Sequence, residues 1–350
     1  MIQCEPQLPT LSVIMPNYNH ARFLPESLTA ILAQSYRPVE VLVADDASTD
    51  NSVEIIEAFV RKDPLIRLVR NERNLGVVHN ANRLLQLASG DYVYCAAADD
   101  LVLPGLFQKS MELLARYPEA GLCSSMIEIV DAASGKEKNT LLLEKIAKQE
   151  SFIPPGQGLE WLRLHESWIL GNTCIYRLDA LQKAGGFIPE LHSFCDGFIE
   201  MVLALKYGAC FIPEPLAIFR LSVTGYSAST KSNLDHILKI YSHAAELMRT
   251  TYADLFPSDF VNVWENKNLH LYRLSALRNL QKQQMTIVKG FWDHENLVDR
   301  VFSAGLWVGM RTQYFSLISY LLVRFWREMW PVAMRKVRVV LQRLSISWKI

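Results

Sequence analysis

Residues 11–50 read LSVIMPNYNHARFLPESLTAILAQSYRPVEVLVADDASTD, with an amphipathic segment between two short apolar runs. The runs Leu11–Met15 and Val39–Ala44 have the length and composition of buried strands. Pro25 suits a first helical position, and the leucines and isoleucine after it recur at helical spacing. The segment therefore predicts a strand, a helix and a second strand, with polar turns after both strands.

The same alternation continues along the chain. Further strands are predicted over 65–69 and 92–96, and further helices over 53–59, 81–88 and 104–116. Short connections between alternating strands and helices predict an α/β fold with a mostly parallel sheet flanked by helices. In such sheets ligands bind beyond the carboxyl ends of the strands. The polar residues at those ends are Pro16–Asn19, Asp45–Asp46, Asn71–Asn74 and Asp99–Asp100.

The pattern is looser after residue 118. A strand is predicted over 121–130, a variable loop or hairpin over 132–149, a helix over 199–207 and a strand over 209–219. From residue 234 onward the chain reads as helical. We therefore expect a catalytic domain over 9–230, with a Rossmann-like nucleotide-binding half (9–118) and an acceptor half (119–230). A helical C-terminal region follows over 231–350.

Composition excludes several classes of protein. The 36 basic residues equal the 36 acidic ones, which gives no reason to expect a nucleic-acid partner. The six cysteines form no C-x-x-C pair and fit a reducing compartment. The chain does not open with a charged segment followed by an apolar one. Apolar runs such as Phe315–Val323 fall short of the ~20 residues that a spanning helix needs. A cytoplasmic protein without a transmembrane segment is expected.

Two acidic pairs stand at strand ends. Asp45 and Asp46 could accept hydrogen bonds from a nucleobase or a ribose, although Ser48–Asp50 behind them could simply cap a helix. Asp99 and Asp100 follow three alanines, which would let a bulky ligand approach the backbone. Paired carboxylates suit Mg²⁺ or Mn²⁺ that also binds phosphate oxygens. The alternative for the second pair is a cap for the helix near Pro104.

A third candidate lies in the second half. Asp196 could act as a general base that deprotonates an acceptor hydroxyl, with Glu200, one helical turn later, as the fallback base. The alternative is that Asp196 caps the helix that follows it.

Together these residues resemble the family 2 glycosyltransferases of the GT-A fold, which invert configuration at the anomeric carbon. The matching segments are Ser12–Asn19, Asp45–Asp50, Asn74–Gly76, Asn82, Gly90–Tyr92 and Asp99–Asp100. Their order and spacing over residues 11–104 are specific, whereas the match from there to about residue 229 is less so. The resemblance implies transfer of a sugar from a UDP-, dTDP- or GDP-linked donor to a saccharide or lipid-linked saccharide, as in bacterial surface-polysaccharide synthesis.

The resemblance also implies roles for particular residues. Pro16 and Tyr18 would pack against the base, Asp46 or Asp45 would hydrogen-bond it, and Asn82 would lie near the donor. Asp99 and Asp100 would divide ribose contact and metal ligation between them. The family often has a further carboxylate two positions before Asp99, where this chain has Ala97.

In the second half the family's base lies in an acidic motif, commonly a Glu-Asp pair. Asp196 would be that base, with Cys195 in the Glu position. Gly171–Thr173, after Trp168, resemble the strand start that lines the acceptor side. Arg220 and the Thr224–Ser227 loop resemble the segment that closes over the diphosphate, to which Arg220 could donate charge-assisted hydrogen bonds.

The C-terminal region suggests a membrane partner. Its last eight basic residues, from Arg311 to Lys349, interleave with aromatic and aliphatic residues. The same segment contains a single acidic residue, Glu328. This pattern suits a helix lying on an anionic membrane surface, and the alternative is a helical appendix with solvated arginines.

Two rival functions share parts of this pattern. A Rossmann dehydrogenase would need a G-x-G-x-x-G turn where this chain has Pro16–Asn19. A non-catalytic nucleotide-sugar-binding module of the same fold remains the alternative, because Ala97 and Cys195 both depart from the acidic pattern.

Overall fold

The computed structural model describes residues 9–134, 137–141, 147–165, 169–222, 225–269 and 271–272. The chain divides into two compact units, Met1–Ser229 and Thr230–Ile350. The basic segment from Arg311 onward, Trp168 and Thr224 lie outside the described residues.

The first half of unit 1 alternates strands and helices as predicted. Its elements are β1 (Leu11–Asn17), α1 (Leu24–Leu32), β2 (Glu40–Asp45), α2 (Ser52–Val60), β3 (Ile66–Arg70), α3 (Val77–Leu87) and β4 (Tyr92–Cys95). Helix α3 begins four residues before the predicted start, because Gly76, with φ of 90°, sets its N-terminus. Glycine adopts this positive φ without the steric cost that other residues meet.

The second half is more irregular. It contains β5 (Leu101–Val102), α4 (Leu106–Arg116), β6 (Leu122–Asp131), β7 (Glu137–Leu141), β8 (Ser151–Ile153), α5 (Pro155–His165), the 3₁₀ helix η1 (Gly171–Thr173), β9 (Ile175–Arg177), α6 (Leu178–Lys183), the 3₁₀ helix η2 (Pro189–Phe194), α7 (Cys195–Tyr207) and β10 (Ala209–Leu221). Strand β7 pairs antiparallel with β6, which confirms a hairpin in the predicted loop-or-hairpin segment. Helix α8 (Tyr226–Ser232) spans the boundary between the units.

The described strands form one sheet in the order β3-β2-β1-β4-β9-β6-β10-β5, with β7 beside β6 and β8 beside β10. The strands β1 to β4, β6 and β10 run in one direction, and the strands β5, β7, β8 and β9 run in the other. The carboxyl ends of β1, β2, β4 and β10 therefore lie at the same edge as the amino end of β9. This edge is where the polar residues after the strands gather.

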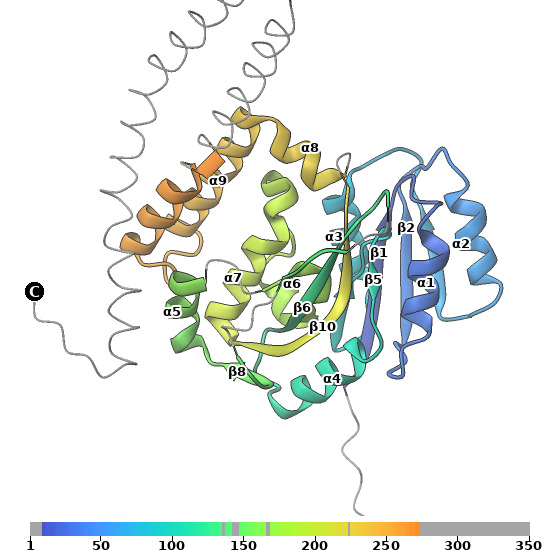
Figure 1. The fold of residues 1–350 in the computed structure, drawn as a ribbon, viewed down its shortest axis with the longest axis horizontal. Helices are drawn as coiled ribbons and strands as arrows, with labels where there is room; N and C mark the ends of the chain where they lie inside the picture. The colour runs from blue at the N-terminus through green and yellow to red at the C-terminus, as the bar shows by residue number, and fades with distance from the viewer. Residues whose placement is uncertain are drawn as a thin grey trace, which may run out of the picture. The chain divides into compact units, whose positions relative to one another are not determined.

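Helices cover both faces of the sheet, with α1 and α2 on one side and α6 and α7 on the other (Figure 1). Successive side chains of a strand point to opposite faces of the sheet. Leu11, Val13 and Met15 of β1 pack in one cluster with α1, α2 and α4, whereas Ile14 between them is fully buried but outside that cluster. The resulting mixed α/β sheet flanked by helices is the predicted fold class.

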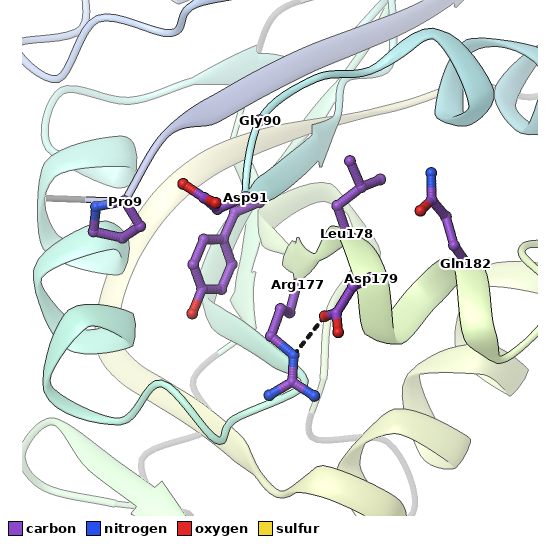
Figure 2. Close-up of a pocket in the computed structure, with 8 residues that line it drawn as sticks. Pro9, Gly90, Asp91, Arg177, Leu178, Asp179 and Gln182 are labelled. Atoms are coloured by element: carbon purple, nitrogen blue, oxygen red, sulfur yellow. Dashed lines mark hydrogen bonds and ion pairs between the residues drawn. The ribbon is translucent and has the colours of Figure 1, made fainter.

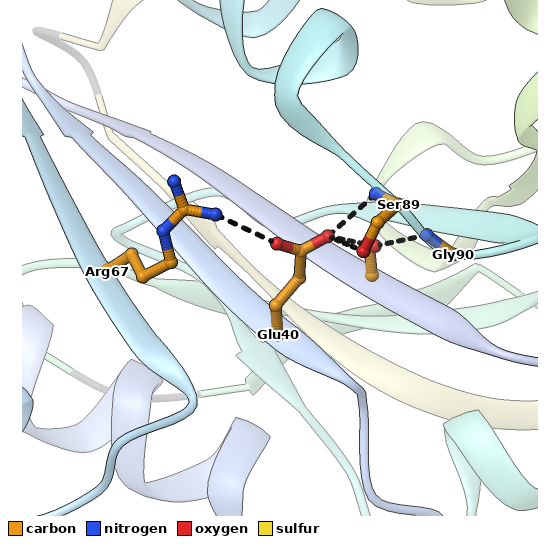
Figure 3. A network of polar contacts seen from close by, with 5 residues as sticks. Glu40, Arg67, Ser89 and Gly90 are labelled. Carbon is orange, nitrogen blue, oxygen red and sulfur yellow. Dashed lines mark hydrogen bonds and ion pairs between the residues drawn. The ribbon is translucent and has the colours of Figure 1, made fainter.

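A buried carboxylate holds the opposite edge of the sheet together (Figure 3). Glu40 Oε1 accepts hydrogen bonds from Ser12 Oγ at 2.8 Å and from both Ser89 N and Ser89 Oγ at 2.7 Å. Ser12 Oγ in turn accepts from Gly90 N at 2.9 Å. Burial alone would raise the pKa of Glu40, but these hydrogen bonds and Arg67 outweigh it and lower the pKa. The network ties β1 and β2 to the segment before β4.

Unit 2 begins with a strongly amphipathic helix, α9 (Leu234–Arg249). It buries Ile237, Ile240, Ala244, Ala245 and Met248, which recur at helical spacing. Asn233 caps its first turn by accepting from His236 N at 3.1 Å. Residues 258–269 are helical as well. Within the described part of the chain, every helix is too short or too polar to span a lipid bilayer.

Candidate active site

The loops after β1 and β2 interlock at the carboxyl edge. Asp45 Oδ1 accepts from Asn17 Nδ2 at 2.9 Å, and Asp45 Oδ2 accepts from Ser48 N at 3.0 Å. Asn19, with φ of 57°, accepts from Thr49 N at 2.8 Å. Asp45 is 2% exposed, so its first role is to hold these two loops in place.

Asp46 holds the loop after β3. Its Oδ1 accepts from Leu75 N at 2.8 Å and Asn71 Nδ2 at 2.9 Å, and its Oδ2 accepts from Gly76 N at 2.9 Å. Burial works to raise the pKa of Asp46, but the hydrogen bonds, led by that from Leu75, lower it. Asp46 is therefore an ionised carboxylate whose two oxygens hold the loop after β3 in place.

The remaining nucleotide-side candidates differ in what they contact. Pro16 lies in β1 opposite Ala44, and Tyr18 follows the strand with 43% of its surface exposed, so its ring is accessible. Asn82 is engaged elsewhere. Its Nδ2 donates to the carbonyl of Phe187 at 2.6 Å, and its Oδ1 accepts from Phe187 N at 2.9 Å. Asn82 therefore joins α3 to the segment before η2.

The second acidic pair is not a helix cap. Helix α4 begins at Leu106 with Gly105 as its N-cap, beyond the reach of a capping bond from Asp99 or Asp100. Asp100 is 6% exposed; its Oδ1 accepts from Arg220 N at 2.8 Å and its Oδ2 accepts from Asn172 Nδ2 at 2.6 Å. Burial, and next the charge of Asp99, raise the pKa of Asp100 to about 7.

Arg220 belongs to the same site. Its Nη1 donates to the carbonyl of Asp99 at 2.9 Å, its Nη2 pairs with Glu26, and its guanidinium lies 5.3 Å from the centre of the Phe23 ring. Glu26 and Phe23 were not predicted as site residues. They belong to α1 and its N-cap, almost 200 positions before Arg220 and no local pattern connects them.

The acidic pair suits a divalent cation. Among the described residues no group of three or more His, Cys, Asp or Glu side chains could hold a metal ion. Mg²⁺ and Mn²⁺ bound with a diphosphate need only one or two carboxylates, because phosphate and water oxygens complete the shell. Burial is the main cause of the raised pKa of Asp100 and the charge of Asp99 comes next; a cation beside the pair would offset that second cause. The donor set therefore fits the ion.

A second carboxylate pair lies at the start of α7. Asp196 is exposed and sits in the first turn, while the N-cap is Phe194, so Asp196 is not the cap. Its Oδ1 accepts from Gly197 N at 2.7 Å. Glu200 is 3% exposed, and its Oε1 accepts from Tyr176 Oη at 2.9 Å. Burial, and next the charge of Asp196, raise the pKa of Glu200 to about 8.

Helix η1 connects the two carboxylate pairs. A Cβ added at Gly171 would lie 2.7 Å from Asp196 Oδ2 and 3.2 Å from Glu200 Oε1. The next residue, Asn172, donates to Asp100 and accepts at its carbonyl from Tyr94 Oη at 2.8 Å. The antiparallel direction of β9 explains this meeting, because it brings the start of β9 to the edge where β4 and β10 end.

Tyr226, from α8, also lies close to this pair. Burial, and next the charges of Cys195 and Asp196, raise the pKa of Tyr226 to about 12. Its hydroxyl lies 3.4 Å from Nδ1 of His192, a residue with φ of 47°. The sequence singled out Tyr226 only as part of the Thr224–Ser227 loop, and it did not single out His192.

A surface hollow lies at the other edge of the sheet (Figure 2). Its lining includes Pro9 and Gly90, which precede β1 and β4, and Arg177 at the end of β9. Arg177 is engaged by Asp179 at 2.9 Å. The hollow is thus at the opposite edge of the sheet from the Asp99–Asp100 pair and the Asp196–Glu200 pair.

The model of the family described as glycosyl transferase family 2 matches residues 12–185. Those residues form a family 2 glycosyltransferase domain. The glycosyltransferase GlyG of Streptococcus pneumoniae serotype 4 is 35% identical over 98 residues, which are 28% of this chain and 33% of GlyG. The uncharacterized protein MT1568 of Mycobacterium tuberculosis is 28% identical over 226 residues, which are 63% of this chain and 70% of that protein. The uncharacterized protein Mb1547 of Mycobacterium bovis is 28% identical over 225 residues, and the matched segment is 60% of its length.

Two solved glycosyltransferase structures share the fold of this domain. Staphylococcus aureus TarS, in complex with UDP-GlcNAc, has a TM-score of 0.57 at 17% identity, over 75% of this chain and 71% of TarS. The mannosyltransferase PcManGT from Pyrobaculum calidifontis, in complex with GDP-Man and Mn²⁺, has a TM-score of 0.52 at 18% identity, over 95% of this chain and 88% of PcManGT. The fold is therefore of the GT-A type.

Proposed function

We propose that this glycosyltransferase moves a hexosyl group from a nucleotide-diphosphate donor to an acceptor hydroxyl in a single displacement that inverts the anomeric configuration. The observation that carries the proposal is the position of η1 between the two carboxylate pairs. A Cβ at Gly171 would lie within 3.2 Å of Asp196 and Glu200, and the next residue, Asn172, donates to Asp100. A group for the leaving side and a group for the attacking side thus flank consecutive residues.

Exposure supports Asp196 as the base. Asp196 lies at the surface, where an acceptor can reach it, whereas Glu200 is 3% exposed and already accepts from Tyr176. A general base must come within hydrogen-bond distance of the proton that it removes, and it contributes about 10² to 10⁴ in rate. Asp196 would take the acceptor proton as the acceptor oxygen attacks the anomeric carbon.

The donor would bind across the carboxyl edge. Pro16 and the exposed Tyr18 ring would pack against the base, and Asp46, or Asp45, would accept a hydrogen bond from it. Asn82 would contribute through the loop that it positions at Phe187.

Asp99 and Asp100 would hold the cation, and one of them would also contact the ribose. Mg²⁺ or Mn²⁺ bound there would supply Lewis acidity toward the departing diphosphate. Arg220 would donate to a diphosphate oxygen by exchanging its partner Glu26, whose side chain is 62% exposed.

Isothermal titration with UDP, dTDP and GDP, each with Mn²⁺ or EDTA, tests the donor site. We expect metal-dependent binding of one nucleotide that Asp99→Ala or Asp100→Ala weakens and the surface control Asp254→Ala does not. Binding of a nucleotide without any hydrolysis of its sugar donor would favour a non-catalytic binding module. Retained anomeric configuration in the product, measured by NMR, would exclude the single displacement.

We further propose a lipid-linked saccharide as acceptor, in cell-surface polysaccharide synthesis, with the enzyme cytoplasmic and peripheral on the inner face of the membrane. Its support is the basic, aromatic-rich sequence after Arg311 and the free thiols of Cys95, Cys123, Cys174, Cys195 and Cys210. Flotation with anionic vesicles should be lost on truncation after Met310. Equal flotation of both forms would contradict the membrane role.

A further inference from the structure

Asn82 connects two parts of unit 1 that are far apart in the sequence. It lies on α3 and is partly buried. Its Nδ2 donates to the carbonyl of Phe187 at 2.6 Å, and its Oδ1 accepts from the amide of Phe187 at 2.9 Å, 105 positions later in the chain. Because both backbone groups of Phe187 bond to one planar side-chain amide, the contact fixes the orientation of that backbone as well as its distance from α3.

The loop before η2 is shaped for this contact. Gly185 and Gly186 have φ of 92° and 75°, a backbone conformation that residues other than glycine rarely adopt. A Cβ at Gly186 would also lie 2.7 Å from Asn82 Oδ1, so glycine lets the amide come this close. A separate bond from Gln182 Nε2 to the carbonyl of Leu85, at 3.0 Å, holds α6 against α3. The packing of α6 on α3 therefore has its own support, and what Asn82 adds is the position of the loop.

The Phe187 ring carries this position to the helix that bears the second carboxylate pair. The ring is 4% exposed and meets Tyr176 of β9 edge to face, with ring centres 6.0 Å apart and planes at 84°. Tyr176 Oη donates to Glu200 Oε1 at 2.9 Å. Glu200 lies about one helical turn after Asp196 on α7. Three successive contacts therefore join Asn82 to the helix that carries Asp196.

Helix α3 links both sides of the proposed reaction. At its N-terminus Gly76 N donates to Asp46 Oδ2 at 2.9 Å, which ties the helix to the carboxylate proposed to bind the base. Asn82 lies six positions further on, about 9 Å along the helix axis. Beyond Phe187 the chain enters η2, which packs against both α3 and α7 and leads directly into α7. The nucleotide contact and the Phe187 contact are thus separate points on one helix.

We infer that Asn82 is a positioning residue: its two hydrogen bonds to Phe187 set, through the Phe187 ring and Tyr176, where α7 presents Asp196 to the donor. A shift of about 1 Å in a catalytic group can cost on the order of 10² in rate. The contact between Asp46 and the start of α3 does not pass through Phe187. Loss of the Asn82 amide therefore lowers turnover and leaves nucleotide affinity unchanged. The inference rests on the proposed role of Asp196 as the base.

Hydrogen exchange measured by mass spectrometry tests the contact without any activity. The Phe187 amide hydrogen is bound by Asn82 Oδ1, so Asn82→Ala should speed exchange at residues 185–188 by about tenfold, as the loss of one hydrogen bond allows. Gln182→Ala is the matched control, because it removes one amide-to-carbonyl bond between α6 and α3 and leaves Phe187 bonded. Exchange at 185–188 that is the same in Asn82→Ala and wild type would overturn the inference.

Steady-state hydrolysis of UDP-N-acetylglucosamine or GDP-mannose, paired with titration of UDP or GDP, tests the positioning role. Asn82→Ala should lower kcat about 10- to 100-fold, while KM and the nucleotide Kd stay within about threefold. Gln182→Ala should keep all three within about twofold of the wild type, because the contact with Phe187 is intact. A residue that only stabilised the fold would not separate kcat from nucleotide affinity in this way.

Phe187→Leu tests the route through the ring. It keeps the backbone bonds to Asn82 and most of the apolar volume, but it removes the edge-to-face contact with Tyr176. It should lower kcat with nucleotide affinity unchanged, and the loss in Asn82→Ala/Phe187→Leu should be smaller than the product of the two single losses, because both act on one path. Should Asn82→Ala fail to fold, Phe187→Leu alone decides, and wild-type turnover in it would overturn the inference.

The remaining outcomes separate the two proposals. If Asn82→Ala weakens nucleotide binding and leaves kcat unchanged, Asn82 is a donor-binding residue and the inference fails. If Gln182→Ala lowers kcat as much as Asn82→Ala does, the loss comes from general loosening between α3 and α6, and the inference fails. If exchange at 185–188 responds as expected but the wild type neither binds nucleotide nor hydrolyses either donor, the proposed function fails and the positioning role fails with it.

Discussion

Replacing Gly171 with alanine tests the site at the point where its two halves meet. The added Cβ would lie 2.7 Å from Asp196 Oδ2, whereas ordinary contacts begin near 3.4 Å, so one side must move by about 0.7 Å. The oxygen belongs to the end of a side chain, which can swing away at little cost in stability. The alternative, a shift of η1, would pull Asn172 from Asp100.

Either movement should harm turnover more than folding. A misplacement of about 1 Å in a catalytic group can cost on the order of 10² in rate. We therefore expect Gly171→Ala to reduce hydrolysis of the nucleotide-sugar donor about 10- to 100-fold. Its free energy of unfolding should fall by no more than about 1–3 kcal/mol, the usual range for overpacking. UDP and GDP binding should stay within a few fold if the side chain, rather than η1, moves.

The assay pairs steady-state hydrolysis with isothermal titration and urea unfolding. Gly156→Ala on α5 is the matched control, because a Cβ there meets nothing within 4 Å. Wild-type turnover in Gly171→Ala, with the protein folded and binding nucleotide, would refute the reasoning. It would mean that the position of the Asp196 carboxylate has no bearing on the rate.

Three further predictions concern the sheet and the acidic pair. Glu40→Gln should lower the free energy of unfolding, measured by urea titration, by about 1–3 kcal/mol at pH 7. Because folding lowers the pKa of Glu40, the difference in unfolding free energy between wild type and variant should shrink as pH falls below 4.5. Gly90→Ala should lower Tm by several degrees, since its Cβ would lie 2.7 Å from Ser12 N, and an unchanged Tm would contradict this packing. Arg220→Lys should weaken metal-dependent nucleotide binding about tenfold, because lysine cannot bridge the Asp99 carbonyl and a phosphate in the same geometry; calorimetry with equal affinities would refute it.

Local signals predicted most of the first half of the fold. Buried strands carry runs such as Leu11–Met15, and turn residues mark their ends, so the strand positions were readable within one or two residues. Helix α3 was the exception. Its first turn, from Val77, precedes the apolar repeat that was used to find it, and Gly76 alone marks its start.

The acidic pairs illustrate where sequence reading stops. Asp45, Asp46, Asp99 and Asp100 were singled out as candidates because each pair follows a strand. Their partners were not deducible, and the structure assigns Asp45 and Asp46 to loop anchoring while Asp100 receives Arg220 and Asn172. Whether a carboxylate is exposed or occupied depends on which distant backbone donors meet it.

The sequence alone was sufficient for the alternation of strands and helices, for the strand ends at which we propose that the donor binds, and for Asp196 and Glu200 as candidate acids. These are local properties, set by residue periodicity and turn chemistry over a few positions. Only the tertiary structure decided that Glu200 is buried against Tyr176, that η1 joins Asp196 to Asp100, and that Arg220 meets Phe23 and Glu26. Those contacts follow from strand order and direction, especially the reversed β9, and such long-range pairing is not encoded in any short stretch of the chain.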